Sequence, residues 1–258
     1  MATRLWSARL MQFVLLHAPT GSRPTRVVRF ANGIVMKLDL ADRAQAAMFC
    51  GTHEATETRL LADLLRPGDV FVDTGAHVGW YTLRAAKAVG GTGTVVAIEP
   101  FPANTDALRE SGPERILERT NRRRSRRCRG RCCEIGRQLA GRTGNARARL
   151  SRDATVDRCH VRVAPLDDLL PAELVPTVVK IDVEGFECHV IDGGTAALSR
   201  ARAVLLELHP GALVEHGRTP TRVQERLKAL GFARIDPIPR GWPLGRTATS
   251  HFNVVARR

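Results

Sequence analysis

The chain alternates short, mainly apolar segments with segments of helical periodicity, and this alternation restricts its fold more than any other feature of the sequence. The clearest apolar run is Val70-Phe71-Val72, and segments with at most two polar residues recur at 93–98, 177–181 and 203–208. A short apolar run without polar alternation is typical of a strand buried on both faces of a parallel sheet. Such strands, separated by helices, predict an α/β fold with a doubly wound, mostly parallel sheet.

Helical periodicity predicts the intervening helices at 54–65, 80–89, 102–110, 184–198 and 220–230. The apolar segments at 232–235 and 252–256 have no obvious helix between them, so we expect an antiparallel pair at the edge of the sheet. At 258 residues, the chain is long enough for one such domain with a full core.

The first fifty residues are expected to form an extension ahead of this domain. Asn32-Gly33 lies between two apolar segments, which predicts a β-hairpin over 27–40. The apolar stretch at 10–18 is shorter than the roughly 18 residues that a membrane-spanning helix needs, and no small-x-small cleavage motif follows it. We therefore interpret it as a helix packed on the domain. The predicted division is an N-terminal helix and hairpin over 1–50 and one α/β domain over 51–258.

One segment, 119–152, breaks the alternating pattern. It holds thirteen Arg, no Lys and one acid, so it carries +12 of the protein's net charge of +14. It has no aromatic residue, and no apolar stretch in it exceeds two residues. We therefore expect this segment to be poorly ordered and to leave the sheet without a clear third strand, because little apolar area offsets the entropy of ordering it.

Three interpretations of the segment 119–152 stay open. Enrichment in Arg, Cys, Gly and Ala is what out-of-frame reading of a GC-rich gene would produce. A basic insert that contacts nucleic acid is the second interpretation, although aromatic stacking partners are absent. The third is a zinc site at Cys128, Cys132 and Cys133, whose spacing fits tetrahedral ligation poorly. The missing aromatic partners argue against a nucleic-acid partner, and the lack of an apolar stretch of about 18 residues argues against a membrane partner.

The other three cysteines, Cys50, Cys159 and Cys188, are scattered along the chain. Isolated thiols of this kind are typical of a reducing compartment. The sequence therefore predicts a cytoplasmic protein, and it leaves the oligomeric state open.

The first buried strand is followed by the loop Asp73-Thr74-Gly75-Ala76-His77-Val78-Gly79. Ligands of doubly wound sheets bind outside the carboxyl ends of the strands, and glycines let the backbone turn tightly and approach a ligand. The dinucleotide fingerprint G-x-G-x-x-G aims amides at a pyrophosphate, whereas an acid leading the loop repels phosphate. The loop therefore favours a cationic ligand such as S-adenosylmethionine, the alternative being a glycine turn with a capping Asp.

Ionisable side chains also lie at the ends of three other predicted strands. Glu99 follows 93–98, where a carboxylate can accept hydrogen bonds from ribose hydroxyls or simply lie at the surface. Asp182 and Glu184 follow 177–181, although Glu184 could merely cap a helix. The segment 203–208 has an acid, Glu207, near its end and is followed by His209, for which a structural role is the alternative. All these residues are expected at the same edge of the sheet.

These motifs resemble those of FkbM-type S-adenosylmethionine-dependent methyltransferases. Residues 67–82 resemble the first motif of that family, and Ile98-Glu99-Pro100 with Asn104 resembles the second. The blocks 166–169 and 180–185 resemble the two that most distinguish the family, and 51–54 resembles its upstream G-x-x-E element. The resemblance covers about residues 25–110 and 160–258. Family members normally carry, after the second motif, a third strand and an acid that contacts the adenine, where this chain has the Arg-rich segment.

The resemblance implies a seven-stranded, Rossmann-like methyltransferase sheet and an enzyme that transfers a methyl group to oxygen, typically a hydroxyl of a sugar or natural product. It implies that S-adenosylmethionine is held by Asp73, Gly75, His77, Gly79, Glu99, Pro100 and Asn104. A base near the acceptor aids the loss of the hydroxyl proton, and the candidates are His209, Asp182 and Glu184.

Two alternatives to this assignment stay open. We assign no metal ligand, because the resemblance does not demand one, but Asp182 with neighbouring acids could hold Mg²⁺ as in catechol-type enzymes. The other alternative is a nucleic-acid-binding or RNA-modifying protein that uses 119–152 on a methyltransferase fold, either with or without catalytic activity.

Overall fold

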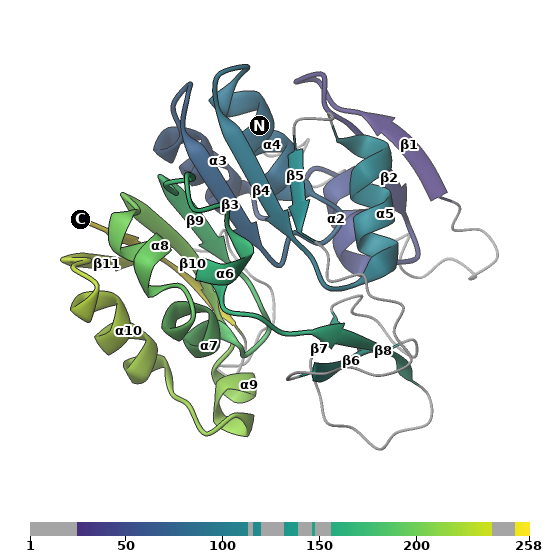
Figure 1. Cartoon of the computed structure of the whole chain (residues 1–258). Helices are drawn as coiled ribbons and strands as arrows, with labels where there is room; N and C mark the ends of the chain where they lie inside the picture. Colours follow the sequence, from purple (N-terminus) through teal and green to yellow (C-terminus); the bar gives the residue numbers. More distant parts are fainter. Residues whose placement is uncertain (1–24, 113–115, 120–131, 139–145, 148–155, 239–250) are drawn as a thin grey trace.

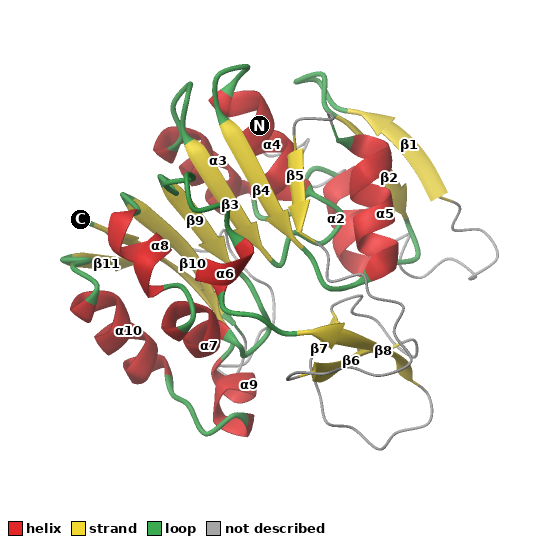
Figure 2. Ribbon diagram, viewed as in Figure 1, coloured by secondary structure: helices red, strands yellow, loops and turns green. Residues whose placement is uncertain are grey.

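The computed structural model describes residues 25–112, 116–119, 132–138, 146–147, 156–238 and 251–258. The centre of the molecule is one seven-stranded sheet with helices packed on both faces (Figures 1 and 2). Its strands are β3 (Val70–Thr74), β4 (Thr94–Ile98), β5 (Ile116–Arg119), β9 (Val178–Ile181), β10 (Ala203–Leu208), β11 (Arg234–Pro237) and β12 (Phe252–Arg257).

The strand order is β11-β12-β10-β9-β3-β4-β5. Strands β10, β9, β3, β4 and β5 are parallel, whereas β12 runs antiparallel to β10 on one side and to β11 on the other. The chain moves outward from β3 through β4 to β5 and then starts again at β9, beside β3. The order therefore reverses between β3 and β9, which is where ligands bind in open α/β sheets.

Two hydrophobic cores cover the two faces of the sheet. Adjacent residues of a strand point to opposite faces, so Phe71 is buried in one core and Val72 in the other. Helices α3 (Ala55–Leu64) and α4 (Trp80–Val89) contribute to the first core. The second core is covered by α7 (Glu187–Asp192), α8 (Thr195–Arg200) and α10 (Pro220–Ala229). The remaining described helices are α2 (Arg43–Phe49), α5 (Pro102–Ser111), α6 (Leu166–Leu169) and α9 (Pro210–Glu215).

The predicted hairpin is present as β1 (Thr25–Arg29) and β2 (Val35–Asp39), which pair antiparallel. Met36 and Leu38 are fully buried in the same core as Phe71, so the hairpin packs on the sheet through the helices of that face. The boundary at residue 50 stays a prediction, and the expected helix at 10–18 lies outside the described residues.

The single helix expected at 184–198 is wrong, because the structure has two helices there, α7 and α8. Gly193 and Gly194 separate them, and a Cβ at Gly194 would come within 2.8 Å of the Leu166 side chain. The first expected turn is also not helical, since Glu184 and Gly185 have φ angles of +51° and +105°. Tertiary contacts therefore override the helical periodicity of this stretch.

The sheet does have a third parallel strand, β5, which pairs with β4 directly before the Arg-rich segment. Within that segment, β6 (Cys132–Gln138) and β7 (Ala146–Arg147) form a separate antiparallel sheet with β8 (Val156–Arg162), in the order β7-β6-β8 (Figure 1). The expectation of poor order is thus wrong for β6 and β7, which backbone pairing holds without a long apolar run. The rest of the segment lies outside the described residues.

No helix in the described ranges combines the length and the apolar character that crossing a membrane requires.

Candidate functional site

The loop after β3 has a backbone path that only glycine allows at two positions. Gly75 has a φ of +83°, and a Cβ there would overlap the carbonyl oxygen of Asp182. Gly79 has a φ of +92°, and a Cβ there would overlap the Leu108 side chain. The Gly75 amide also donates to the carbonyl of Ile98, at 2.9 Å. The loop is therefore held between the ends of β4 and β9, at the point where the strand order reverses.

Asp73 ends β3 as a fully buried carboxylate. Its Oδ2 accepts a hydrogen bond from Thr82 Oγ1 at 2.6 Å, and its Oδ1 lies 3.8 Å from Lys180 Nζ. Burial raises the pKa of Asp73, although Lys180 and Thr82 oppose this effect. Among the described residues, the buried Oδ1 has no hydrogen-bond partner, and Lys180 is its neighbouring charge.

Glu99 lies at the end of β4 and is 5% exposed. Its Oε2 accepts from the His77 amide at 2.8 Å, and its Oε1 accepts from the Phe101 amide at 2.8 Å and from Asn104 Nδ2 at 3.2 Å. A carboxylate offers about four acceptor positions, so one remains, on Oε2. Burial raises the pKa of Glu99, and His77 opposes the shift.

The other three predicted cofactor residues lie around Glu99. Asn104, on the first turn of α5, is buried and orients the Glu99 carboxylate through its amide. His77 has a φ of +51°, and within the described part of the chain its buried Nε2 has no hydrogen-bond partner. Pro100 is partly buried and directly follows Glu99. These residues therefore form one cluster around the loop after β3.

Lys180 connects the loop after β3 with the end of β9. This buried ammonium lies 2.9 Å from Asp182 Oδ2 and packs on the Tyr81 ring, whose hydroxyl donates to Glu54 at 2.5 Å. Burial opposes the charge on Lys180, but the carboxylates of Asp182 and Asp73 outweigh it and raise the pKa. Burial would raise the pKa of Asp182, but Lys180 outweighs that effect and lowers it. Both groups are therefore charged at neutral pH.

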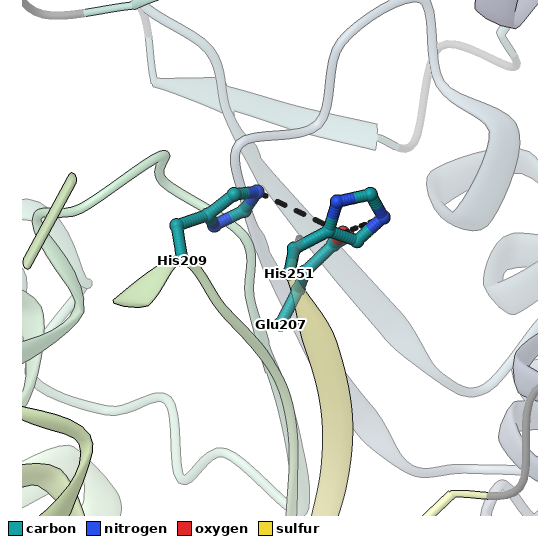
Figure 3. Close-up of side chains that lie close together, drawn as sticks. All are labelled: Glu207, His209 and His251. Atoms are coloured by element: carbon teal, nitrogen blue, oxygen red, sulfur yellow. Dashed lines mark ion pairs between the residues drawn. The ribbon is translucent and has the colours of Figure 1, made fainter. Parts of the chain in front are cut away.

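His209 lies at the centre of an acidic cluster beside the end of β10. Its Nδ1 is 3.0 Å from Glu187 Oε1, and its Nε2 is 3.4 Å from Glu184 Oε2. The same Nε2 lies 3.7 Å from Glu207 Oε1, which also pairs with His251 Nε2 at 2.9 Å (Figure 3).

The cluster shifts the pKa values of its members. Burial alone would lower the pKa of His209, but the neighbouring carboxylates outweigh the effect of burial and raise the pKa. Burial and Asp182 raise the pKa of Glu207 well above its ordinary value.

The structure thus separates the predicted site residues into two adjacent groups. Residues at the ends of β3 and β4 form the first, and Asp182, Glu184 and His209 form the second, near the ends of β9 and β10. Sequence reasoning missed Lys180, Glu187 and His251 as members of the site, and it noted Glu207 near the end of its strand without giving it a role. His251 could have been found from the predicted antiparallel edge pair, because the pairing of Phe252 with Leu208 brings the residue before β12 next to His209.

A doubly wound sheet of seven strands with β12 inserted antiparallel, and a glycine loop headed by an acid after its first strand, defines the Rossmann-like methyltransferase fold. A family model described as the methyltransferase FkbM domain matches residues 73–233. The chain belongs to this family of FkbM methyltransferase domains.

One curated relative is the hexuronic acid methyltransferase AglP of Haloferax volcanii, which is 28% identical over 164 residues. The match covers 59% of this chain and 61% of that protein. Among solved structures, an S-adenosylmethionine-dependent O-methyltransferase from Thermotoga maritima has a TM-score of 0.49 at 16% identity and covers 91% of this chain and 78% of that chain. A TehB-like methyltransferase from Corynebacterium glutamicum has a TM-score of 0.45 at 12% identity, with coverages of 84% and 94%.

Proposed function

We propose that the protein is an S-adenosylmethionine-dependent methyltransferase that methylates a hydroxyl oxygen of a sugar or another small molecule. The observation that carries this proposal is the pair of buried carboxylates, Asp73 and Glu99, that flank the glycine loop at the switch point. Glu99 keeps an acceptor position, and neither carboxylate would tolerate a phosphate beside it. Membership of the FkbM family supports the same conclusion.

The residues of the loop fit the methyl donor. Glu99 Oε2 has room for one ribose hydroxyl, while Asp73 and the loop backbone suit the amino group and the cationic sulfur. Gly75 and Gly79 let the loop pack against the Asp182 carbonyl and the Leu108 side chain, which fixes its backbone at the switch point. When bound, S-adenosylmethionine supplies an electrophilic methyl group, and its sulfur keeps the bonding electron pair as an acceptor oxygen forms the new bond.

The acidic cluster around His209 would bind the acceptor and remove its proton. Glu187 holds the imidazole through Nδ1, so His209 Nε2 and the neighbouring Glu184 carboxylate are the two groups placed to take the hydroxyl proton. Asp182 is neutralised by Lys180 and is therefore a weaker base than its place suggests. The hexuronic acid relative supports a sugar acceptor, although the match spans only 61% of that protein.

Isothermal titration with S-adenosylhomocysteine tests the proposal. We expect binding, and we expect Glu99→Ala to weaken it by about 1–3 kcal/mol, because charge-assisted hydrogen bonds are lost. Glu110→Ala is the matched control, since Glu110 is an exposed acid at the far end of α5. Tight binding of NADH with no response to S-adenosylhomocysteine would refute the proposal in favour of a dehydrogenase.

We also propose a cytoplasmic location. The described cysteines Cys50 and Cys188 are free thiols, which supports a reducing compartment.

A further inference from the structure

Three side chains with metal-binding chemistry converge where β10 ends and β12 begins (Figure 3). We propose that Glu207, His209 and His251 bind a divalent transition-metal ion such as Zn²⁺. One ligand atom from each of the three residues lies within 4.8 Å of the other two. Glu207 and His209 are buried and His251 is partly exposed, so a ligand can reach the site from one side.

The distances between the ligand atoms of the three residues are close to those needed to bind one shared ion. Two donor atoms that each lie about 2.1 Å from one ion are about 3.0–3.4 Å apart for bond angles between 90° and the tetrahedral value. Glu207 Oε1 lies 2.9 Å from His251 Nε2 and 3.7 Å from His209 Nε2. The separation of Glu207 from His209 needs to close by about 0.3 Å, and that of the two imidazole nitrogens, which lie within 4.8 Å of each other, by up to about 1.4 Å to reach the tetrahedral spacing. A small rotation of the His251 side chain, which is 26% exposed, can supply this movement.

A second observation supports a ligand role for His209. Its Nδ1 lies 3.0 Å from Glu187 Oε1, and Glu187 is fully buried and further held by the Gly185 amide at 3.0 Å. Metal-binding histidines usually donate their other ring N–H to a carboxylate, which fixes the tautomer and the ring orientation. With Nδ1 protonated toward Glu187, the lone pair of Nε2 faces Glu207 and Glu184.

The donor set selects the class of metal. Two imidazoles and one carboxylate suit Zn²⁺, Fe²⁺ or Co²⁺, whereas Mg²⁺ and Ca²⁺ prefer oxygen ligands. The proposed ion is therefore a different one, in a different place, from Mg²⁺ on Asp182. Three protein ligands leave a coordination position for water or a substrate oxygen.

The use of that open position rests on the function proposed above. An acceptor hydroxyl bound to the ion would ionise more easily, since a Lewis acid stabilises the oxygen anion. The O–H bond breaks with its electron pair on oxygen, and the proton passes to Glu184, whose Oε2 lies 3.4 Å from His209 Nε2. His209 is then a ligand and not the base.

Titration of the metal-stripped full-length protein with Co²⁺, followed by visible absorption, tests the site directly. We expect one ion per chain with the bands of a low-symmetry nitrogen and oxygen site, and we expect Zn²⁺ to displace it. Glu207→Gln and His251→Ala should each weaken Co²⁺ binding at least tenfold, and Glu187→Gln should weaken it by about 10–100-fold. His189→Ala is the matched control, because His189 lies beside His216 and Phe186, outside the cluster.

Binding of S-adenosylhomocysteine to each variant shows that it is folded and separates the two proposals. A wild-type protein that binds S-adenosylhomocysteine but gives no Co²⁺ band overturns the metal site alone. Unchanged Co²⁺ affinity in both Glu207→Gln and His251→Ala overturns it as well. A Co²⁺ band that responds to these variants, in a protein that does not bind S-adenosylhomocysteine, supports the metal site and refutes the methyltransferase proposal.

Discussion

At the scale of single residues, Gly75 has the least freedom to change. Gly75→Ala should lower the free energy of unfolding by at least about 3 kcal/mol, because strain at positive φ adds to the overlap with the Asp182 carbonyl. Gly217→Ala is the control, since Gly217 also has a positive φ, +66°, but has open space around it. Its cost should be about 1 kcal/mol. Urea unfolding measures both, and equal costs would show that the overlap is relieved by a small backbone shift.

Glu99 should leave a signature in the pH dependence of stability. Burial raises its pKa above the ordinary value of 4.5, so the folded protein holds this proton more tightly than the unfolded chain does. Its contribution to the free energy of unfolding is complete below about pH 4.5 and is lost as the pH rises through the folded pKa. Glu99→Gln removes this titration, so the stability of the wild type relative to the variant should fall as the pH rises.

Urea unfolding of both proteins at a series of pH values from about 4 to 8 measures this difference. Glu173→Gln, a change of an exposed acid, serves as the control. A difference between wild type and Glu99→Gln that stays constant with pH would contradict the shifted pKa.

The group of site residues around Glu99 was easier to predict from the sequence than the group around His209. The residues around Glu99 follow directly after two apolar runs, so their place at the sheet edge could be predicted. Glu184, Glu207 and His251 come from distant parts of the chain, and His251 belongs to no motif. Only the pairing of β12 with β10 brings His251 into the cluster, and side-chain distances of this kind depend on packing that periodicity does not encode.

At the scale of elements, Asp167 explains part of the motif at 166–169. Its carboxylate accepts from the amides of Ala196 and Ala197 at 3.0 and 2.9 Å, and so caps α8 from a neighbouring helix. The helix has no side-chain cap at its own N-cap residue, Gly194. Asp167→Ala should therefore lower the free energy of unfolding by about 1–2 kcal/mol. Asp168→Ala, at the exposed next position, should cost less than about 0.5 kcal/mol.

Denaturant unfolding of the two variants measures these costs, and equal losses of unfolding free energy would mean that Asp167 does not act as a cap.

Residues 165–167 and the two glycines between α7 and α8 also show why the prediction of one helix over 184–198 was wrong. A continuous helix over 184–198 satisfies the apolar periodicity, but the glycines let Pro165 and Leu166 approach the backbone between α7 and α8. Strand β5 was missed for a different reason: it offers only two apolar residues at the sheet edge, too few to stand out.

At the scale of the whole molecule, the small sheet β7-β6-β8 pairs with no strand of the seven-stranded sheet among the described residues. Replacing residues 120–162 by a flexible Gly/Ser linker should therefore keep cooperative unfolding, with a change of about 1 kcal/mol or less. Circular dichroism during urea unfolding measures this. Loss of the cooperative transition would show that the small sheet belongs to the core of the domain.

The same deletion variant tests the nucleic-acid alternative. If the Arg-rich segment binds RNA, retention of the full chain on RNA at low salt should fall steeply with added salt and should vanish in the deletion variant. Equal retention of the two proteins would remove that alternative.

The loops after β3 and β9 meet at backbone level, so the proposed donor side and the proposed acceptor side of the site share a backbone contact. Gly75 lies against the Asp182 carbonyl, and the Asp182 amide donates to the Thr74 carbonyl at 3.0 Å. A ligand that restricts one loop also restricts the other, so the second ligand meets a partly ordered site and loses less entropy on binding. By thermodynamic linkage, the factor by which the first ligand changes the affinity for the second equals the factor by which the second changes the affinity for the first. We therefore expect the two halves of the site to bind their ligands cooperatively, whichever ligand binds first.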